Sequence, residues 1–315
     1  MIDKLIGNTP YIKIKYKYKD KIDYVYAKLE YYNLTGSIKD RLALYIINKN
    51  KKEGILKEGM PIIEATSGNT GISFSAIGAY YNHPVYIFMP DWVSVERIKL
   101  MEMYGAKVFL VSKEEGGFAE CINRANKLAK EINGFRPNQF DNIDNIYAHY
   151  NTTGKEIVDE IPNIEAFVSG IGTGGTLMGV AKRLKENNIN TKIYAMEPSE
   201  LPLISKGMKI KDHKIEGIGD DFIPSIVDKN IIDGIVTISS EDAILMAKKI
   251  AKELGIGVGI SSGANLLSAI LIKENTKGNV VTIFVDDNKK YLSTDLTKNI
   301  KPSKLINNIN LIDIE

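Results

Sequence analysis

A glycine-rich segment at residues 170–176 has the composition of an anion-binding site. It reads Gly-Ile-Gly-Thr-Gly-Gly-Thr and lies between an apolar run and a segment with helical periodicity. Free backbone N–H groups and the helix dipole at such a position attract a negatively charged group. Thr173 and Thr176 favour a single phosphate group, because hydroxyls beside the glycines can complete a cup around it.

The same segment also satisfies the dinucleotide-binding pattern G-x-G-x-x-G. Glu197 follows about 20 residues later, as that pattern requires. Taken alone, the match therefore supports a nucleotide-dependent dehydrogenase, and a plain tight turn is the simplest alternative.

A second cluster of polar side chains lies at residues 64–71, which read Glu-Ala-Thr-Ser-Gly-Asn-Thr-Gly. Before another helical segment, hydroxyl or amide groups occupy four of five consecutive positions: Thr66, Ser67, Asn69 and Thr70. A helix N-cap needs only one such side chain. We therefore expect this loop to bind a carboxylate through hydroxyl and N–H groups, with a hydrophilic turn as the alternative.

A third candidate is Lys39, in the segment Asn-Leu-Thr-Gly-Ser-Ile-Lys-Asp-Arg at residues 33–41. It comes one residue after a predicted helix start, where the positive end of the dipole lowers the pKa of an amine. Such a lysine can form an imine with a carbonyl group. On its own, however, a lysine between Asp40 and Arg41 is more often a solvated surface residue.

The three polar segments lie within a regular alternation of predicted strands and helices. Continuous apolar runs with strand character indicate strands that are buried on both faces, as in parallel sheets. They occur at residues 24–29, 61–65, 85–89, 107–111, 165–168, 192–196, 235–238 and 279–285. Helical periodicity occurs between them, as at Leu177, Val180, Ala181 and Leu184, and at Ala243, Met246, Ala247 and Ile250. The alternation predicts an α/β fold, with a possible domain boundary at residues 141–145.

Length and composition exclude several classes of protein. A chain of 315 residues with 44% hydrophobic and 25% charged residues is folded, and it is long enough for one large domain or two. The net charge of +2, with basic residues spread along the chain, argues against nucleic-acid binding. The dense basic stretch at residues 13–21 is better explained as a solvated hairpin or loop. With Cys121 as the only cysteine and three scattered histidines, neither a disulfide nor a metal site is expected.

The N-terminus lacks the apolar stretch of a signal peptide, and no window approaches the length of a membrane span. We therefore expect a cytoplasmic protein.

Taken together, the three polar segments resemble the fold-type II pyridoxal-phosphate enzymes, specifically the cysteine synthase and cystathionine β-synthase family. The likeness includes Ser-x-Lys-Asp-Arg, Thr-Ser-Gly-Asn-Thr-Gly and Gly-Thr-Gly-Gly-Thr, and runs from Gly7 to Thr294. It implies two α/β domains of the tryptophan synthase β type, with twisted, mainly parallel sheets flanked by helices. The larger domain would comprise residues 1–34 and 146–315, and the smaller, mobile one residues 35–145. The family also implies a homodimer with pyridoxal 5'-phosphate between the domains.

The resemblance implies a role for each matching residue. Lys39 would hold the cofactor as an imine and later move the substrate α-proton. The other cofactor-binding residues would be Asn69 at the ring hydroxyl, Gly172, Thr173, Gly174, Gly175 and Thr176 at the phosphate, and Ser261 at the pyridine nitrogen. The residues facing the amino-acid substrate would be Thr66, Ser67, Asn69, Thr70, Gln139 and Gly217. A serine cannot keep the ring nitrogen protonated, so the cofactor would favour β-replacement or β-elimination through an aminoacrylate over transamination.

One loop departs from the family pattern. Cysteine synthases usually have Gly-Ile-Gly-Ala-Gly-Phe-Ile-Pro where this chain has Gly-Ile-Gly-Asp-Asp-Phe-Ile-Pro at residues 217–224. Asp220 would place a base near the substrate β-carbon, able to activate water. The preferred reaction is therefore L-cysteine and water giving L-serine and hydrogen sulfide, or its reverse. Asp221 is the weaker candidate for this base, and the aspartates could instead cap the next turn.

Other activities remain open at this stage. An ordinary cysteine synthase would use O-acetylserine and sulfide, and a cystathionine β-synthase would use homocysteine as the nucleophile. A non-catalytic relative would bind the carboxy-terminal tail of a partner protein in the old active site. A dehydrogenase is the least favoured of these alternatives, and His149 is expected to be structural.

Overall fold

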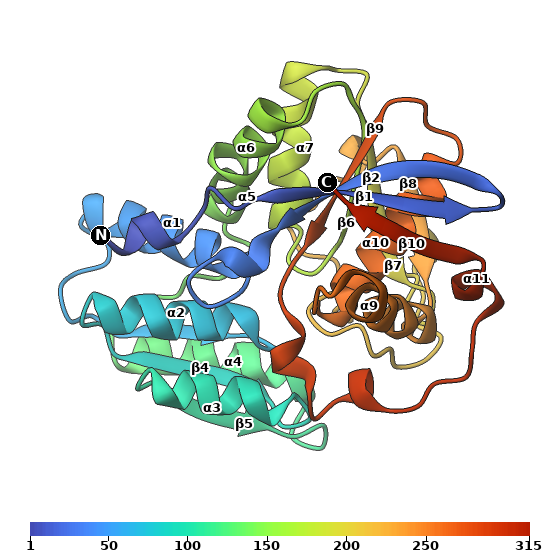
Figure 1. The fold of residues 1–315 in the computed structure, drawn as a ribbon. Coiled ribbons are helices and arrows are strands. Elements are labelled where there is room, and N and C mark those ends of the chain that lie inside the picture. Colours follow the sequence, from blue (N-terminus) through green and yellow to red (C-terminus); the bar gives the residue numbers. More distant parts are fainter.

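The computed structural model describes residues 1–315, which form two β-sheets with helices on their faces (Figure 1). The larger sheet has seven strands in the order β10-β1-β2-β9-β6-β7-β8. Its strands are β1 (Tyr11–Tyr18), β2 (Lys21–Leu29), β6 (Ile164–Gly170), β7 (Lys192–Pro198), β8 (Gly234–Ile238), β9 (Asn279–Phe284) and β10 (Ile309–Ile314). From β2 to β8 every pair is parallel, whereas β1 pairs antiparallel with both β2 and β10.

The smaller sheet contains three parallel strands in sequence order. They are β3 (Ile62–Ala65), β4 (Val85–Pro90) and β5 (Lys107–Val111). The helices of this half are α1 (Lys39–Lys52), α2 (Asn69–Tyr80), α3 (Val95–Met103) and α4 (Gly117–Glu131). Buried side chains of α2 and α3 share one apolar cluster with the sheet, and those of α4 form another on the opposite face.

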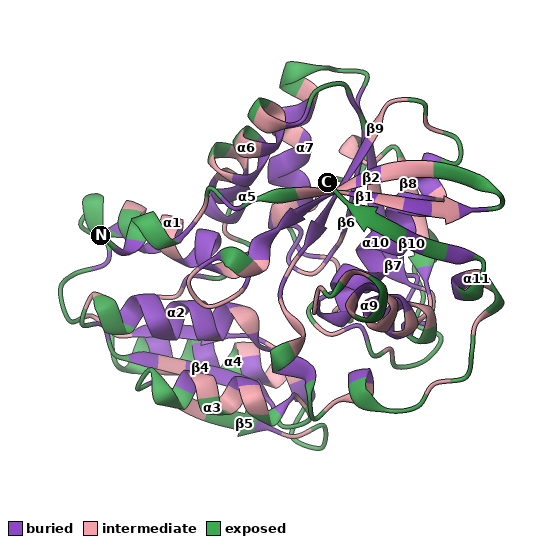
Figure 2. Ribbon diagram, in the orientation of Figure 1, coloured by how far each residue is buried: buried purple, intermediate pink, exposed green.

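The larger sheet is also covered on both faces. Its helices are α5 (Asp144–Asn151), α6 (Thr153–Glu160), α7 (Gly175–Asn187), α9 (Ser240–Leu254) and α10 (Ile260–Lys273), with the short α8 (Leu203–Lys206) and α11 (Lys304–Asn307). Helices α9 and α10 pack on one face, and α6 and α7 pack on the other. In β6, Phe167 faces the second cluster while its neighbours Ala166 and Val168 face the first. Figure 2 shows the resulting buried strands between half-exposed helices.

The predicted α/β fold with mainly parallel sheets is confirmed, and each of the eight predicted strands overlaps an observed one. The apolar faces predicted for α7 and α9 are buried in the core. Two strands were not predicted as such, β1 and β10. In β1 the residues Ile14, Tyr16 and Tyr18 are buried and alternate with lysines, so the basic stretch forms a hairpin with β2.

The strands are unevenly distributed along the chain. All three strands of the smaller sheet fall within residues 35–145, and all seven of the larger sheet lie outside that range. Within the segment 141–145, where a boundary was expected, residues 141–143 form a loop and α5 begins at Asp144. The bounds of the two domains therefore stay a prediction.

No helix is both long and apolar enough to cross a membrane, and no cluster of His, Cys, Asp or Glu side chains could hold a metal ion.

Candidate active site

A pocket between the two sheets brings together the three polar segments that are far apart in sequence. Predicted site residues that line it are Lys39, Thr66, Ser67, Asn69, Thr70, Gln139, Gly172, Thr173, Gly174, Thr176, Gly217, Asp220 and Ser261. Of the predicted site residues, Gly175 and Asp221 do not line it. Two of the segments follow the carboxyl ends of β3 and β6, where open α/β sheets bind their ligands, and the segment with Lys39 comes after β2.

Lys39 is the first residue of α1, and its neighbours fix that first turn. The backbone N–H of Ile38 donates to the carbonyl of Val285 just after β9, at 3.0 Å. The Asp40 carboxylate accepts hydrogen bonds from the backbone N–H and the hydroxyl of Thr35, both at 2.6 Å. The start of α1 is therefore attached to the end of β9, and Lys39 points into the space between the sheets.

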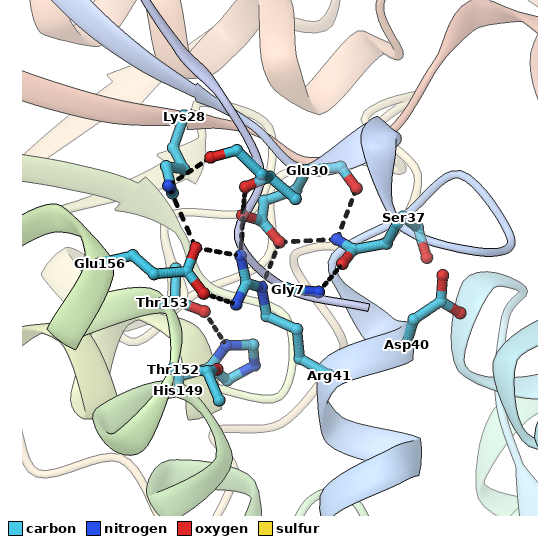
Figure 3. Close-up of polar contacts among 12 residues, drawn as sticks. Gly7, Lys28, Glu30, Ser37, Asp40, Arg41, His149, Thr152, Thr153 and Glu156 are labelled. Carbon is cyan, nitrogen blue, oxygen red and sulfur yellow. Dashed lines mark hydrogen bonds and ion pairs between the residues drawn. The ribbon is translucent and has the colours of Figure 1, made fainter. Parts of the chain in front are cut away.

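A buried ion network around Arg41 fixes α1 further (Figure 3). Arg41 donates to Glu30 and to Glu156, in each case at 2.6 Å, and the side chains of Arg41 and Glu30 are fully buried. Lys28 pairs with Glu156 at 3.1 Å and with Glu160 at 2.8 Å. Burial opposes ionisation of Glu156, but its hydrogen bonds with Arg41 prevail and lower its pKa to about 2. The network thus joins α1 to the end of β2 and to α6.

Among the titratable groups that line the pocket, Lys39 and Asp220 have shifted pKa values that bear on proton transfer. Burial lowers the pKa of Lys39 to about 8, although the charge of Asp220 opposes the shift. Burial raises the pKa of Asp220 to about 6, with Lys39 opposing the shift and Asp221 adding to it. Near neutral pH the pocket therefore contains an amine that can readily lose its proton and a carboxylate that can accept one.

The glycine-rich segment forms a tight cradle at the N-terminus of α7. Gly174 adopts a φ of +87°, a left-handed conformation that favours glycine. A side chain at Gly175 would collide with Asn145, and one at Gly172 would collide with the carbonyl of Gly217. The Asn145 side chain also donates to the Thr173 hydroxyl at 2.9 Å. The cradle thus places the backbone at the N-terminus of α7, with the Thr173 and Thr176 hydroxyls beside it, along the pocket, where an anion can bind.

His149 stands behind this cradle. One ring nitrogen lies 3.3 Å from the Thr176 hydroxyl and the other lies 3.0 Å from the Thr153 hydroxyl. Burial, together with the charges of Lys39 and Arg41, lowers its pKa well below the ordinary value. The ring is therefore neutral and serves as a hydrogen-bonding support, as expected for a structural histidine.

The second polar segment forms the N-terminus of α2. The Thr70 hydroxyl donates to the Gln139 side chain at 2.6 Å, and the Gln139 amide donates to the carbonyl of Ala65 at 2.9 Å. The backbone N–H of Gly68 donates to the Thr66 hydroxyl at 3.0 Å. We refer to residues 66–70 as the carboxylate loop.

The two aspartates of the loop at residues 217–224, which departs from the family pattern, have different surroundings. Asp220 lines the inner pocket together with Lys39. Asp221 is exposed and pairs with Lys209 at 2.8 Å on the outer surface. The geometry thus favours Asp220 over Asp221 for chemistry in the pocket.

Sequence reasoning assigned no role to several polar residues around the pocket. Asp286 accepts hydrogen bonds from Asn69 and from the Tyr291 hydroxyl, both at 2.7 Å. Arg41, Glu30 and the residues of the ion network had no assigned role either. In the sequence, such residues are marked only by a charged side chain within or next to an apolar run, as for Lys28 in β2. This pattern shows neither which residue is the ion-pair partner nor what the ion pair stabilises.

The pocket suits pyridoxal phosphate. The cradle and the Thr173 and Thr176 hydroxyls suit a phosphate, and the amine of Lys39 suits an aldehyde. The Oδ1 atom of Asn69 is buried and has no hydrogen-bond partner, so it is free to meet a polar group of a bound ring. Ser261, buried in the first turn of α10, lies in the same pocket.

Comparisons with known proteins agree with this assignment. The protein family described as pyridoxal-phosphate dependent enzyme matches residues 2–286. A cysteine synthase of Staphylococcus aureus is 41% identical over 299 residues, which cover 94% of this chain and 96% of the relative. A cysteine synthase structure from Entamoeba histolytica, 38% identical, superimposes with a TM-score of 0.88 and covers 98% of this chain and 93% of its own.

The structure of a hydrogen sulfide-producing enzyme from Fusobacterium nucleatum is also similar. It is 47% identical, has a TM-score of 0.96, and the match covers 100% of this chain and 96% of that one. A mutant of the same enzyme, with an aspartate replaced by asparagine, has been crystallised with an α-aminoacrylate intermediate.

Proposed function

The chain belongs to the family of pyridoxal-phosphate-dependent enzymes, and on that basis we propose that it converts L-cysteine and water into L-serine and hydrogen sulfide. Its similarity to cysteine synthases and to a hydrogen sulfide-producing enzyme places it among the enzymes of β-replacement in cysteine metabolism. The choice of cysteine and water within that chemistry is the proposal.

The position of Asp220 is the observation that carries this proposal. A carboxylate with a pKa of about 6, raised by burial, is ionised at neutral pH and able to take a proton from water. Hydrosulfide already carries its charge and needs no such base. The aspartate-to-asparagine mutant of the Fusobacterium enzyme, crystallised with an aminoacrylate, supports a role for an aspartate in this step.

The other residues of the pocket bind and orient. Bound pyridoxal phosphate would withdraw electrons from the substrate α-carbon, which lets the β-substituent leave. Lys39 is placed to hold the cofactor and to take up the α-proton, because burial makes its amine easy to deprotonate. The carboxylate loop and Gln139 would orient the amino-acid carboxylate. Hydrosulfide would depart first. Asp220 would then remove one proton from water, so that the water oxygen bonds to the β-carbon while Lys39 returns the α-proton, and the proton taken from water leaves with hydrosulfide as hydrogen sulfide.

The second candidate is a cysteine synthase that uses O-acetylserine and sulfide. The 41% sequence identity with the Staphylococcus aureus cysteine synthase favours this activity. A steady-state comparison of cysteine, serine and O-acetylserine as first substrates separates the two. The proposal expects sulfide and serine from cysteine alone. A large preference for O-acetylserine, with no sulfide from cysteine, would establish the cysteine synthase instead.

The lowered pKa of Lys39 predicts how the protein takes up its cofactor. Only a neutral amine attacks an aldehyde, so the rate at which cofactor-free protein captures pyridoxal phosphate should rise with pH and level off above about 8. Stopped-flow absorption measures this rate. Since Asp220 raises the pKa of Lys39, Asp220→Asn should move the curve to lower pH. A midpoint at the ordinary lysine value of 10.5 would contradict the assignment.

Closure around the substrate is a further prediction. The carboxylate loop belongs to the smaller sheet and the phosphate cradle to the larger one, so binding of an amino acid should draw the two sheets together and exclude water. Crystal structures of the holoenzyme with and without bound amino acid test this. The same relative orientation of the sheets in both structures would count against closure.

We also propose that the protein is a homodimer, as the family resemblance implies.

A further inference from the structure

Arg97 of α3 runs beneath the carboxylate loop. Its side chain is buried, with 2% exposed. A side chain added at Gly68 would collide with the Cδ and Nε atoms of Arg97. The stem of Arg97 therefore packs directly against the backbone of the carboxylate loop, and only glycine at position 68 permits this contact.

The guanidinium group of Arg97 reaches the loop that contains Asp220. It forms an ion pair with Glu216, the residue immediately before Gly217, and lies 4.5 Å from the centre of the Tyr291 ring. The Arg97 side chain is buried and that of Glu216 is partly buried, so removing Glu216 would leave the charge of Arg97 without its carboxylate partner. A single side chain thus touches the loop expected to bind the substrate carboxylate and holds the loop expected to activate water.

The position of Arg97 is itself fixed by contacts at the start of α3. The Ser94 hydroxyl accepts from the Arg97 guanidinium at 3.1 Å and donates to the carbonyl of Lys290 at 2.7 Å. The Glu96 carboxylate accepts from the backbone N–H of Ser293 at 2.8 Å. These bonds join the start of α3 to the short 3₁₀ helix η4 (Asn288–Tyr291) and to Ser293 just after it, in the segment that follows β9 toward the smaller sheet (Figure 1).

We propose that Arg97 is a positioning residue that holds Glu216, and through it Asp220, in a fixed relation to the carboxylate loop. This rests on the proposed function, since Asp220 must deliver water to the β-carbon for serine to form. When water is not delivered, the three-carbon product leaves and hydrolyses, so that cysteine and water give pyruvate, ammonia and hydrogen sulfide. Arg97 therefore sets the ratio of serine to pyruvate.

The test compares Arg97→Lys, Glu216→Gln and the control Arg124→Lys in the holoenzyme. Arg124 is an ion-paired arginine on α4, outside the pocket. Arg124→Lys therefore makes the same chemical change as Arg97→Lys at a site away from the pocket. Serine and pyruvate are measured from cysteine. A displaced catalytic group can cost about 10²-fold in rate, so both pocket variants should lower the serine-to-pyruvate ratio by about tenfold or more. The control should keep the wild-type ratio, because a general loss of stability lowers both products together.

Affinity for L-alanine, which has no leaving group at its β-carbon, is the second readout. Arg97→Lys should weaken alanine binding because the packing against Gly68 changes, whereas Glu216→Gln should leave it unchanged. A wild-type product ratio in Glu216→Gln, or equal changes in Arg97→Lys and Arg124→Lys, would overturn the proposal. If the wild-type enzyme forms no serine, the proposed function fails. In that case the affinity for L-alanine still tests the contact between Arg97 and the carboxylate loop. An unchanged affinity in Arg97→Lys overturns the positioning role of Arg97.

Discussion

The Lys39→Ala variant is expected to lose at least about 10²–10⁴-fold in kcat/KM for cysteine, the range for loss of an acid–base group alone. The loss should be larger in practice, because the same amine is proposed to anchor the cofactor. The structure supports both roles, since Lys39 lies in the pocket at the start of α1 and burial lowers its pKa to about 8.

Borohydride reduction of the holoenzyme followed by peptide mapping measures the anchoring directly. The cofactor should be fixed to the peptide that contains Lys39. Lys155→Ala, on the exposed surface of α6, is the control and should retain the label and the activity. Attachment of the cofactor to another lysine would contradict the whole assignment of the site.

Replacing Asp220 by asparagine should abolish serine formation while leaving the release of the first sulfide intact. Asparagine keeps nearly the same volume but lacks the basic oxygen, so shape and proton transfer are separated. Loss of a general base costs about 10²–10⁴-fold in rate. Rapid mixing with cysteine, with separate measurement of sulfide and serine, distinguishes the two steps.

The matched control is Asp221→Asn, because Asp221 is exposed and pairs with Lys209 outside the pocket. It should keep serine formation within a few-fold of wild type. In the wild-type enzyme, serine formation should fall as the pH drops through about 6, where Asp220 becomes protonated. An effect of Asp220→Asn below about tenfold would show that Asp220 is not the base. Loss of serine in Asp221→Asn alone would move the role to that residue.

The family and its cofactor could be predicted from the sequence because their signals reside in three short segments. Hydroxyls, glycines and a lysine at a helix start each indicate a function locally, and their order indicated a family. The family pattern already made Asp221 the weaker candidate for the base, but the sequence does not show which of two adjacent, chemically identical residues faces the pocket. Only the fold shows that one lines the pocket while the other contacts solvent and Lys209.

The supporting contacts could not be predicted, because their partners are distant in sequence. Arg41 meets Glu156 across 115 positions and Arg97 meets Glu216 across 119. No local pattern specifies such a pairing. Strand β10 was missed for a related reason, because its place beside β1 depends on an antiparallel pairing between the two ends of the chain.

The most direct test of the central claim is the fate of solvent oxygen when the holoenzyme acts on cysteine in water labelled with heavy oxygen. Each sulfide released should be accompanied by one serine, and the serine hydroxyl should carry the label. Sulfide accompanied by pyruvate and ammonia without labelled serine would contradict it, as would rapid turnover of O-acetylserine with no sulfide from cysteine.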